Sequence, residues 1–222
     1  MKNRFTLQNT TSQRLQNLRL FARGILLSAF VGVLGYEQIE QMRHHEATQH
    51  FFFSAKEDNF YENPANWEPE YPGTVIEADA RIVIQDLAYL TGYNLKVNGL
   101  LEVAMGASLY SDQNDIVLFH EGKLDNHGEI IVNNIRNGGL VFNQMGAKIH
   151  VKSFALEQSG SVQNLRSANF IVIDSLVNQG HFLNYSYCAA GELYNHSQFQ
   201  QTKGSELHID GKSVELVALY RP

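Results

Sequence analysis

The 222-residue sequence has little cysteine, proline or charge. Its single cysteine, Cys188, excludes an intramolecular disulfide, so buried apolar side chains must stabilise the fold. "NYSYCAAG" matches no nucleophile motif, and Cys188 is interpreted as a small packed residue. Four prolines exclude a proline-rich linker, and 44% apolar with 18% charged residues indicates a folded chain.

Acidic residues are absent before Glu37, although five basic residues occur there: Lys2, Arg4, Arg14, Arg19 and Arg23. From Glu37 on, 12 basic residues face all 23 acidic ones, which gives a net charge of −11. A body this acidic would be repelled by a phosphate backbone, so nucleic acid is excluded as a partner.

A long hydrophobic run is also missing. The apolar run 24–35 has 12 residues, whereas a membrane-spanning helix needs about 20. Basic residues followed by a short apolar run are typical of a secretory signal peptide, so 1–35 is interpreted as one, cut after Gly35. An uncleaved membrane anchor or an amphipathic targeting segment is the alternative. Either signal predicts an extracellular or cell-surface protein.

Residues 36–57 are predicted to be a linker with weak helical character. Three histidines in it, His44, His45 and His50, lack the i, i+4 spacing of a metal-binding helix, and we interpret them as solvated. No metal site, cofactor site or catalytic residue is predicted anywhere in the chain.

After residue 60 no helical period persists. Short runs such as "ARIVI", "LLEVA" and "DIVLF" alternate with Gly, Asn and Asp, which predicts an all-β region.

Within this region a five-residue frame recurs: Gly, any residue, an apolar residue, any residue, Asn. Its copies are 122–126, 139–143, 160–164, 180–184 and 191–195. The first three spacings are 17, 21 and 20 residues. A period near 20 in an all-β chain predicts a solenoid with one coil per repeat. The last spacing, 11, indicates that one coil carries the frame at two corners.

Each residue type in the frame has a physical role in a coil. Glycine is expected at a corner where φ is positive. The apolar residue points inward, and the Asn two places on has the same facing. Stacked at about 4.8 Å, Asn amides can form a hydrogen-bonded ladder; the alternative places them in exposed turns. Residues 74–210 then make about seven coils. A β-sandwich is the competing fold, but it does not explain the repeat.

The segment "NFYENPANWEPEYPGTVIEADARIVI" (59–84) precedes the coils and holds the single tryptophan. With the Gly-x-apolar-x-Asn frame, it resembles the start of secreted bacterial adhesins and autotransporter passengers. That resemblance implies a right-handed parallel β-helix on the cell surface, and no particular ligand. We place the solenoid domain at 58–222.

Residues 58–73 are predicted to be its N-terminal cap. Trp67, Phe60 and Tyr61 are expected to cover the first coil edge, and 212–222 to close the other end. A sugar-stacking role is the alternative for Trp67.

The most direct functional prediction is a structural or adhesive surface protein without catalysis, with an extracellular glycan or another surface protein as partner. A carbohydrate-active β-helix is the alternative, because such enzymes use paired carboxylates. Five carboxylates that adjacent coils could bring to one face are Asp112, Asp115, Glu121, Asp125 and Glu129. A solvated acidic face is the simpler interpretation. The remaining histidines lack metal spacing: His120, His127, His150, His181, His196 and His208.

Overall fold

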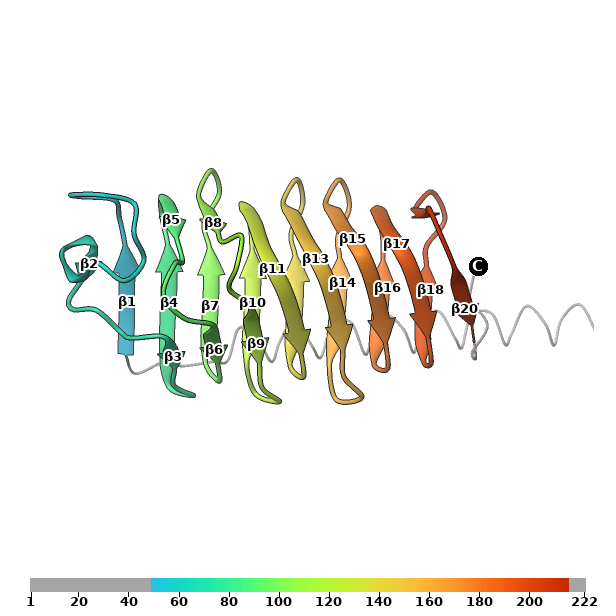
Figure 1. Cartoon of the computed structure of the whole chain (residues 1–222), viewed down its shortest axis with the longest axis horizontal. Coiled ribbons are helices and arrows are strands. Elements are labelled where there is room, and N and C mark those ends of the chain that lie inside the picture. The colour runs from blue at the N-terminus through green and yellow to red at the C-terminus, as the bar shows by residue number, and fades with distance from the viewer. Residues whose placement is uncertain (1–48, 216–222) are drawn as a thin grey trace, which may run out of the picture. The chain divides into compact units, whose positions relative to one another are not determined.

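The computed structural model describes residues 49–215, which form an all-β parallel solenoid of about seven turns (Figure 1). Successive coils are stacked side by side in chain order, and almost every strand pairs in parallel with the strand one coil away. The predicted all-β solenoid and its number of coils are confirmed.

One strand of each coil contributes to a nine-stranded sheet, called sheet A here. Its order in space is β18-β16-β14-β12-β10-β7-β4-β1-β2, and only the β1–β2 pair is antiparallel. Its strands are β1 (Gln49–Phe53), β2 (Trp67–Glu68), β4 (Ala80–Ile84), β7 (Leu100–Val103), β10 (Lys123–Asn126), β12 (Leu140–Asn143), β14 (Ser161–Asn164), β16 (His181–Asn184) and β18 (Gln198–Gln201).

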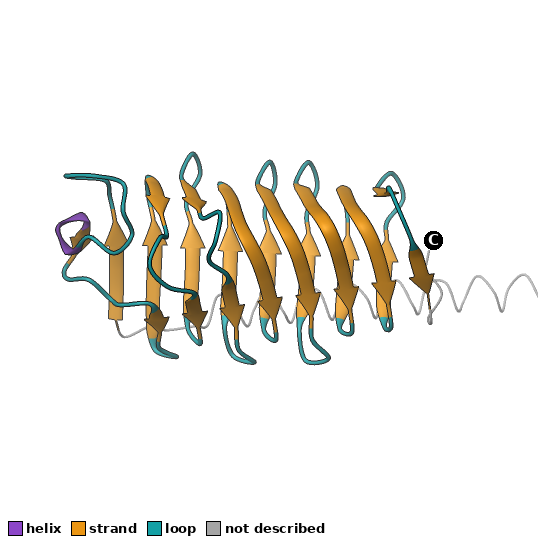
Figure 2. Ribbon diagram, viewed as in Figure 1, coloured by secondary structure: helices purple, strands orange, loops and turns teal. Residues whose placement is uncertain are grey.

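The rest of each coil lies in an eleven-stranded sheet, called sheet B. Figure 2 shows its long strands crossing in front of the short strands of sheet A. Its strands are β3 (Val75–Ile76), β5 (Leu87–Tyr89), β6 (Leu95–Val97), β8 (Ser108–Tyr110), β9 (Ile116–Leu118), β11 (Glu129–Asn137), β13 (Lys148–Leu156), β15 (Asn169–Asn178), β17 (Tyr187–Asn195), β19 (Glu206–Ile209) and β20 (Ser213–Glu215).

The long strands of sheet B bend in the middle. In β11 the buried positions are Ile130, Val132, Ile135 and Asn137, so the alternation of two is broken once by a step of three. That step turns the backbone, and in the earlier coil the two halves are separate strands, β8 and β9, which both pair with β11. A coil therefore presents three inward-facing segments, and their side chains fill the core.

The apolar residue of the frame stacks in register through the core. Leu124 pairs with Val141, Val141 with Val162, Val162 with Phe182, and Phe182 with Phe199. All five side chains are buried, and the rings of Phe182 and Phe199 stack with their centroids 4.7 Å apart. The inward facing predicted for this position is thus correct.

The asparagines of the frame form the predicted ladder. Nδ2 of Asn126 donates to Oδ1 of Asn143, that of Asn143 to Asn164, and that of Asn164 to Asn184, each at 2.9 Å. Each of these amides also donates to a backbone carbonyl of the next coil in sheet B, as Asn164 does to Tyr187 O at 2.8 Å. These buried amides are therefore satisfied, which removes the cost of burying them.

A second, shorter ladder lies at another corner, as the 11-residue spacing predicts. Nδ2 of Asn178 donates to Oδ1 of Asn195 at 2.7 Å. The position that pairs with both Asn137 and Asn178 is Leu156, which interrupts this ladder. Asn137 donates instead to the backbone oxygen of Ser161 at 3.1 Å.

The predicted role of glycine at the frame corner is wrong. None of the five frame glycines has a positive φ. A Cβ on Gly160 would lie 2.4 Å from Asn137 O, and a Cβ on Gly139 would lie 2.1 Å from Gly122 O. Glycine is required there because the corner backbone packs directly against carbonyl groups of the preceding coil.

The predicted boundary between linker and solenoid is also wrong. Residues 49–53, placed in the predicted linker 36–57, form β1, which pairs in parallel with β4. The solenoid thus starts before residues 58 and 74. The signal peptide or anchor predicted for 1–35, and the rest of the linker up to residue 48, lie outside the described residues.

Between β1 and β4 the chain makes a longer excursion that covers the first coil. It contains the short 3-10 helix η1 (Pro64–Asn66) and β2, which pairs antiparallel with β1. Trp67 and Tyr61 are buried there, and Trp67 Nε1 donates to Tyr61 O at 2.6 Å. Phe60 is 49% exposed. Because Trp67 is only 4% exposed, it offers no face for a stacked sugar.

At the other end, β20 extends sheet B by pairing in parallel with β17. It belongs to the segment 212–222, which we expect to close the solenoid. Residues 216–222 of that segment lie outside the described part.

Candidate functional site

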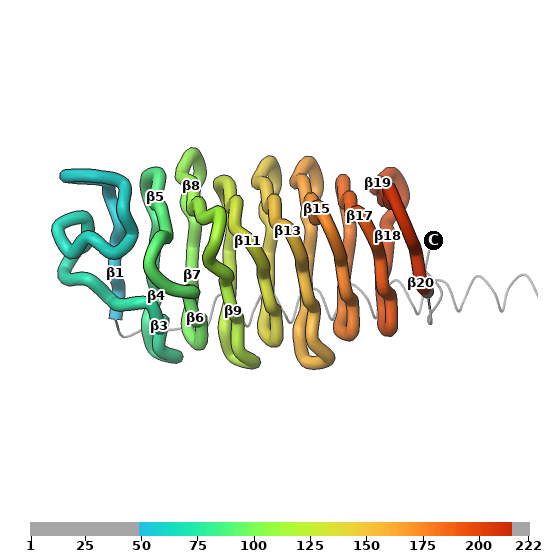
Figure 3. The backbone as a smooth tube through the Cα atoms, viewed as in Figure 1, coloured from blue at the N-terminus to red at the C-terminus, as the bar shows by residue number. Residues whose placement is uncertain are grey.

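The coils differ most where a strand of sheet A turns into sheet B, a place called corner 1 here. Four of these turns have four residues: 104–107, 144–147, 165–168 and 202–205. Two turns lying between them, 127–128 and 185–186, have only two residues. The tube in Figure 3 shows the longer turns standing above their shorter neighbours along this edge.

Each short turn leaves a depression between the longer turns on either side of it. Residues in register across these depressions, such as Asn169, Tyr187 and Glu206, lie on consecutive coils. The two walls are thus two coil spacings, about 10 Å, apart. Two depressions result, and we call them notch 1 and notch 2.

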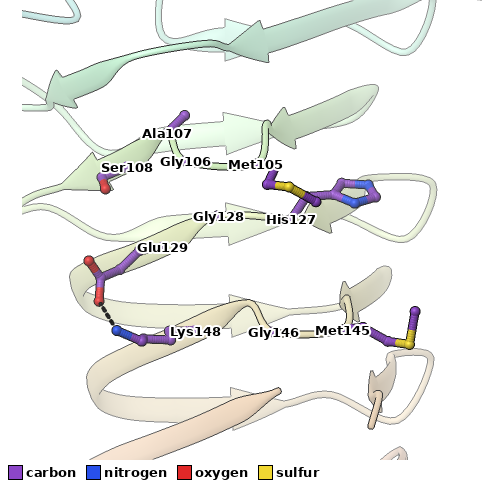
Figure 4. A pocket seen from close by; sticks show the side chains of 10 residues that line it. All are labelled: Met105, Gly106, Ala107, Ser108, His127, Gly128, Glu129, Met145, Gly146 and Lys148. Atoms are coloured by element: carbon purple, nitrogen blue, oxygen red, sulfur yellow. Dashed lines mark ion pairs between the residues drawn. The ribbon is translucent and has the colours of Figure 1, made fainter. Parts of the chain in front are cut away.

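Notch 1 lies over His127 and Gly128 and has a volume of about 400 Å³. Met105 and Met145, on the neighbouring coils, are 84% and 72% exposed (Figure 4). The notch also contains an ion pair, Glu129–Lys148, at 3.5 Å. Its walls are thus apolar and flexible, and its charges are already paired.

Notch 2 lies over the turn 185–186 and also has a volume of about 400 Å³. Its walls carry Arg166 and Ser167 on one side and Lys203 and Gly204 on the other. The residues between and beside them are Tyr185, Ser186, Tyr187, Thr202 and Glu206. Notch 2 therefore combines two cations with two phenol rings.

The cations of notch 2 are uncommitted in a negative molecule. Residues 49–215 contain 20 acidic and 10 basic side chains. Within this range Lys56, Arg81, Arg136 and Lys148 are in ion pairs with carboxylates. Arg166 and Lys203 form no ion pair with any described residue. Partial burial raises the pKa of Tyr185, so its hydroxyl stays protonated and can donate a hydrogen bond.

The backbone of one wall is strained. Ser167 has a φ of 62°, while the equivalent positions of the other long turns are Gly106, Gly146 and Gly204, all with φ near 80°. A side chain in this left-handed conformation costs free energy that glycine avoids. The wall next to Arg166 keeps a serine despite that cost.

The five carboxylates considered for catalysis do not gather in either notch. Only Glu129 lines notch 1, and none of the five lines notch 2. Asp125 points outward from sheet A and accepts from Gln144 Nε2 at 2.6 Å, and Asp115 accepts from the side chains of Asn133 and Asn134. Asp112 and Glu121 lie exposed in turns at other corners.

The six histidines of the coils are likewise dispersed over different coils. Only His127 lines one of the two notches, and its Nε2 lies 3.2 Å from Asp125. Within residues 49–215 no three His, Cys, Asp or Glu side chains are grouped to hold a metal ion. Cys188 is fully buried, as its interpretation as a packing residue requires, and burial raises the pKa of its thiol.

Sequence reasoning missed both notches. It did not single out Arg166, Lys203, Tyr185 or Tyr187. The available signal was the coil length: the coils beginning at Lys123 and His181 have 17 residues to the next paired position, whereas those beginning at Leu140 and Ser161 have 21 and 20. The missing residues are those of the short turns.

Comparisons with models of protein families, with curated proteins and with solved structures found no match to this chain. The class of protein therefore follows from the fold alone, a parallel β-solenoid. Within the described part of the chain, no helix has the length and apolar character that crossing a bilayer requires.

Proposed function

We propose that this chain is an exported, surface-associated solenoid that acts as a structural or adhesive protein and has no catalytic activity of its own. The observation that carries this proposal is the pair of notches on one edge of the solenoid. Each offers side chains suited to binding, and neither brings two carboxylates together. Grooves with few polar groups on a firm scaffold suit ligand recognition.

The rest of the solenoid supports a scaffold role. The core is continuous from coil to coil, and its buried amides donate to one another and to the next coil. Such an interior holds the corner turns at fixed spacing. The N-terminal sequence, with five basic residues before a short apolar run, supports export. The resemblance to adhesins and autotransporter passengers supports a surface location.

Export is tested by expressing the full chain in a secreting bacterial host and fractionating the cells. We expect the protein at the surface or in the medium, with a mature N-terminus at Tyr36 by mass spectrometry. An intact Met1 on surface material would identify an anchor instead of a cleaved signal. Retention inside the cell would contradict the proposal.

Binding without turnover is tested on a glycan array, followed by incubation of any bound polysaccharide with the protein. We expect retention of the ligand and no new reducing or unsaturated ends. Release of such ends would show that the chain is a carbohydrate-active enzyme and would overturn the non-catalytic role.

A further inference from the structure

The geometry of notch 2 points to a specific ligand: we propose that it binds the carboxylate of an acidic sugar residue, such as a uronic acid in an oligosaccharide. This inference rests on the proposed binding role and deepens it by naming the ligand class. It is carried by Arg166 and Lys203 on opposite walls and by Tyr185 and Tyr187 between them.

The charges select an anion. Arg166 and Lys203 form no ion pair with any described residue, although acidic side chains outnumber basic ones two to one over 49–215. In such a molecule a free cation on each wall is a local exception to the surrounding potential. A guanidinium can hold a carboxylate through two parallel hydrogen bonds, and an ammonium adds a point charge.

The other lining groups select a sugar over a bare anion. Phenol rings present an apolar face together with a hydroxyl, which suits the mixed surface of a pyranose. Ser186, Thr202 and the Glu206 carboxylate offer further hydrogen-bonding groups for sugar hydroxyls. The volume of about 400 Å³ and the wall spacing of about 10 Å suit a short saccharide segment.

The acidic body argues against a long polyanion. A nucleic acid or a polyphosphate would carry many charges past the notch onto a surface that repels them. A single carboxylate per sugar can be held between Arg166 and Lys203 with fewer charges against the acidic faces. The strained φ of Ser167 adds an independent pointer, because backbone strain is concentrated at functional sites.

Notch 1 provides an internal comparison. It has the same origin in a two-residue turn and the same volume, but methionines replace the cations on its walls. Its lysine, Lys148, is already paired with Glu129. The inference therefore assigns the acidic sugar to notch 2 alone.

The test uses the full chain, trigalacturonic acid and the methyl ester of the same trisaccharide, with isothermal titration calorimetry. We expect the acid to bind at least about tenfold more tightly than the neutral ester, because a charge-assisted contact is lost in the ester. The double variant Arg166→Gln/Lys203→Gln should lose that preference. The matched control Lys96→Gln/Lys152→Gln removes two exposed, unpaired lysines elsewhere and should keep it.

A second variant tests the notch itself. Replacing Tyr185-Ser186 by the four residues Gln-Met-Gly-Ala, the sequence of the long turn 144–147, should fill notch 2 and abolish binding. Circular dichroism should show an unchanged β-sheet spectrum, because long turns already occur at this corner. If this variant unfolds, the Arg166/Lys203 pair of variants still decides the matter.

Equal affinity for the acid and its ester would overturn the inference, as would an equal loss in the Lys96/Lys152 control. Failure of the folded wild-type protein to bind trigalacturonic acid would also overturn it. Those outcomes leave the proposed surface role to be judged by its own fractionation experiment. Retention of the protein inside the cell would instead contradict the proposed function while leaving the notch chemistry intact.

Discussion

At the residue scale, the frame glycines are selected by their neighbours in the preceding coil. A Cβ on Gly160 would meet two neighbours, Asn137 O at 2.4 Å and a methyl of Leu156 at 2.6 Å. The glycine of a long turn, Gly106, has the opposite constraint: its φ is +82°, but open space surrounds it. The same residue type therefore serves two separate physical needs in one coil.

This difference predicts opposite outcomes for one substitution. Asn tolerates the left-handed region, so Gly106→Asn should cost less than about 1 kcal/mol of unfolding free energy. Gly160→Asn must push two coils apart and should cost more than about 3 kcal/mol. Urea unfolding followed by circular dichroism measures both, and similar costs would refute the close-packing explanation.

Cys188 is predicted to make stability depend on alkaline pH. Burial raises the pKa of its thiol in the folded state, while the unfolded thiol ionises near about 8.5. Above that pH the unfolded state releases a proton that the folded state keeps, so stability falls as pH rises.

The measurement compares urea midpoints at pH 7 and pH 10 for the wild type and for Cys188→Ala, which cannot ionise. The wild type should lose more stability than the variant over this range. An identical loss in both would mean that the thiol is not protected. Thiol labelling should also be slow until urea unfolds the chain.

At the element scale, the interrupted ladder shows how a strand position constrains its neighbours. Leu156 occupies the β13 position that pairs with Asn137 on one side and Asn178 on the other. Because that position has an asparagine one coil away on both sides, an amide there would find polar partners inside the core.

Leu156→Asn should therefore be tolerated better than the same change at Val151, a buried position of the same strand. Val151→Asn buries an amide among apolar side chains and should cost about 3 kcal/mol or more. Leu156→Asn should cost at least about 1 kcal/mol less. Urea unfolding ranks the two, and the reverse order would show that the ladder does not extend to this site.

The elements also show what the sequence allowed us to predict. The frame places Leu124 and Asn126 two residues apart, and a strand must give them the same facing, so the core stack and the ladder follow directly. The corner glycine was misinterpreted because a close approach between coils, unlike a turn, leaves no local signature. Notch 2 depends on the difference between two turn lengths, which becomes meaningful only once strand register is known.

At the scale of the whole solenoid, each coil contacts mainly the coil before and the coil after it. Stability in such a stack is a sum of coil and interface terms, so a local change should weaken with distance along the stack. Its start was harder to predict, since 31 residues separate the paired positions Gln49 and Ala80, well beyond the usual period.

Hydrogen exchange tests this behaviour. Amides of β12 and β14, which have coils on both sides, should exchange more slowly than those of β19 and β20 near the end of the described stack. Phe199→Ala, in β18, should speed exchange in β16 to β19 and leave β4 almost unchanged. A uniform increase over all strands would show that the solenoid unfolds as one cooperative unit.

The excursion that covers β1 gives the stack a direction in time as well as in space. The capped end is synthesised first, so each later coil meets a finished edge on which its strands can register at once. Assembly can then proceed coil by coil as the chain emerges, without waiting for its C-terminal residues. A protein built this way is suited to folding while it is still being threaded through a narrow opening.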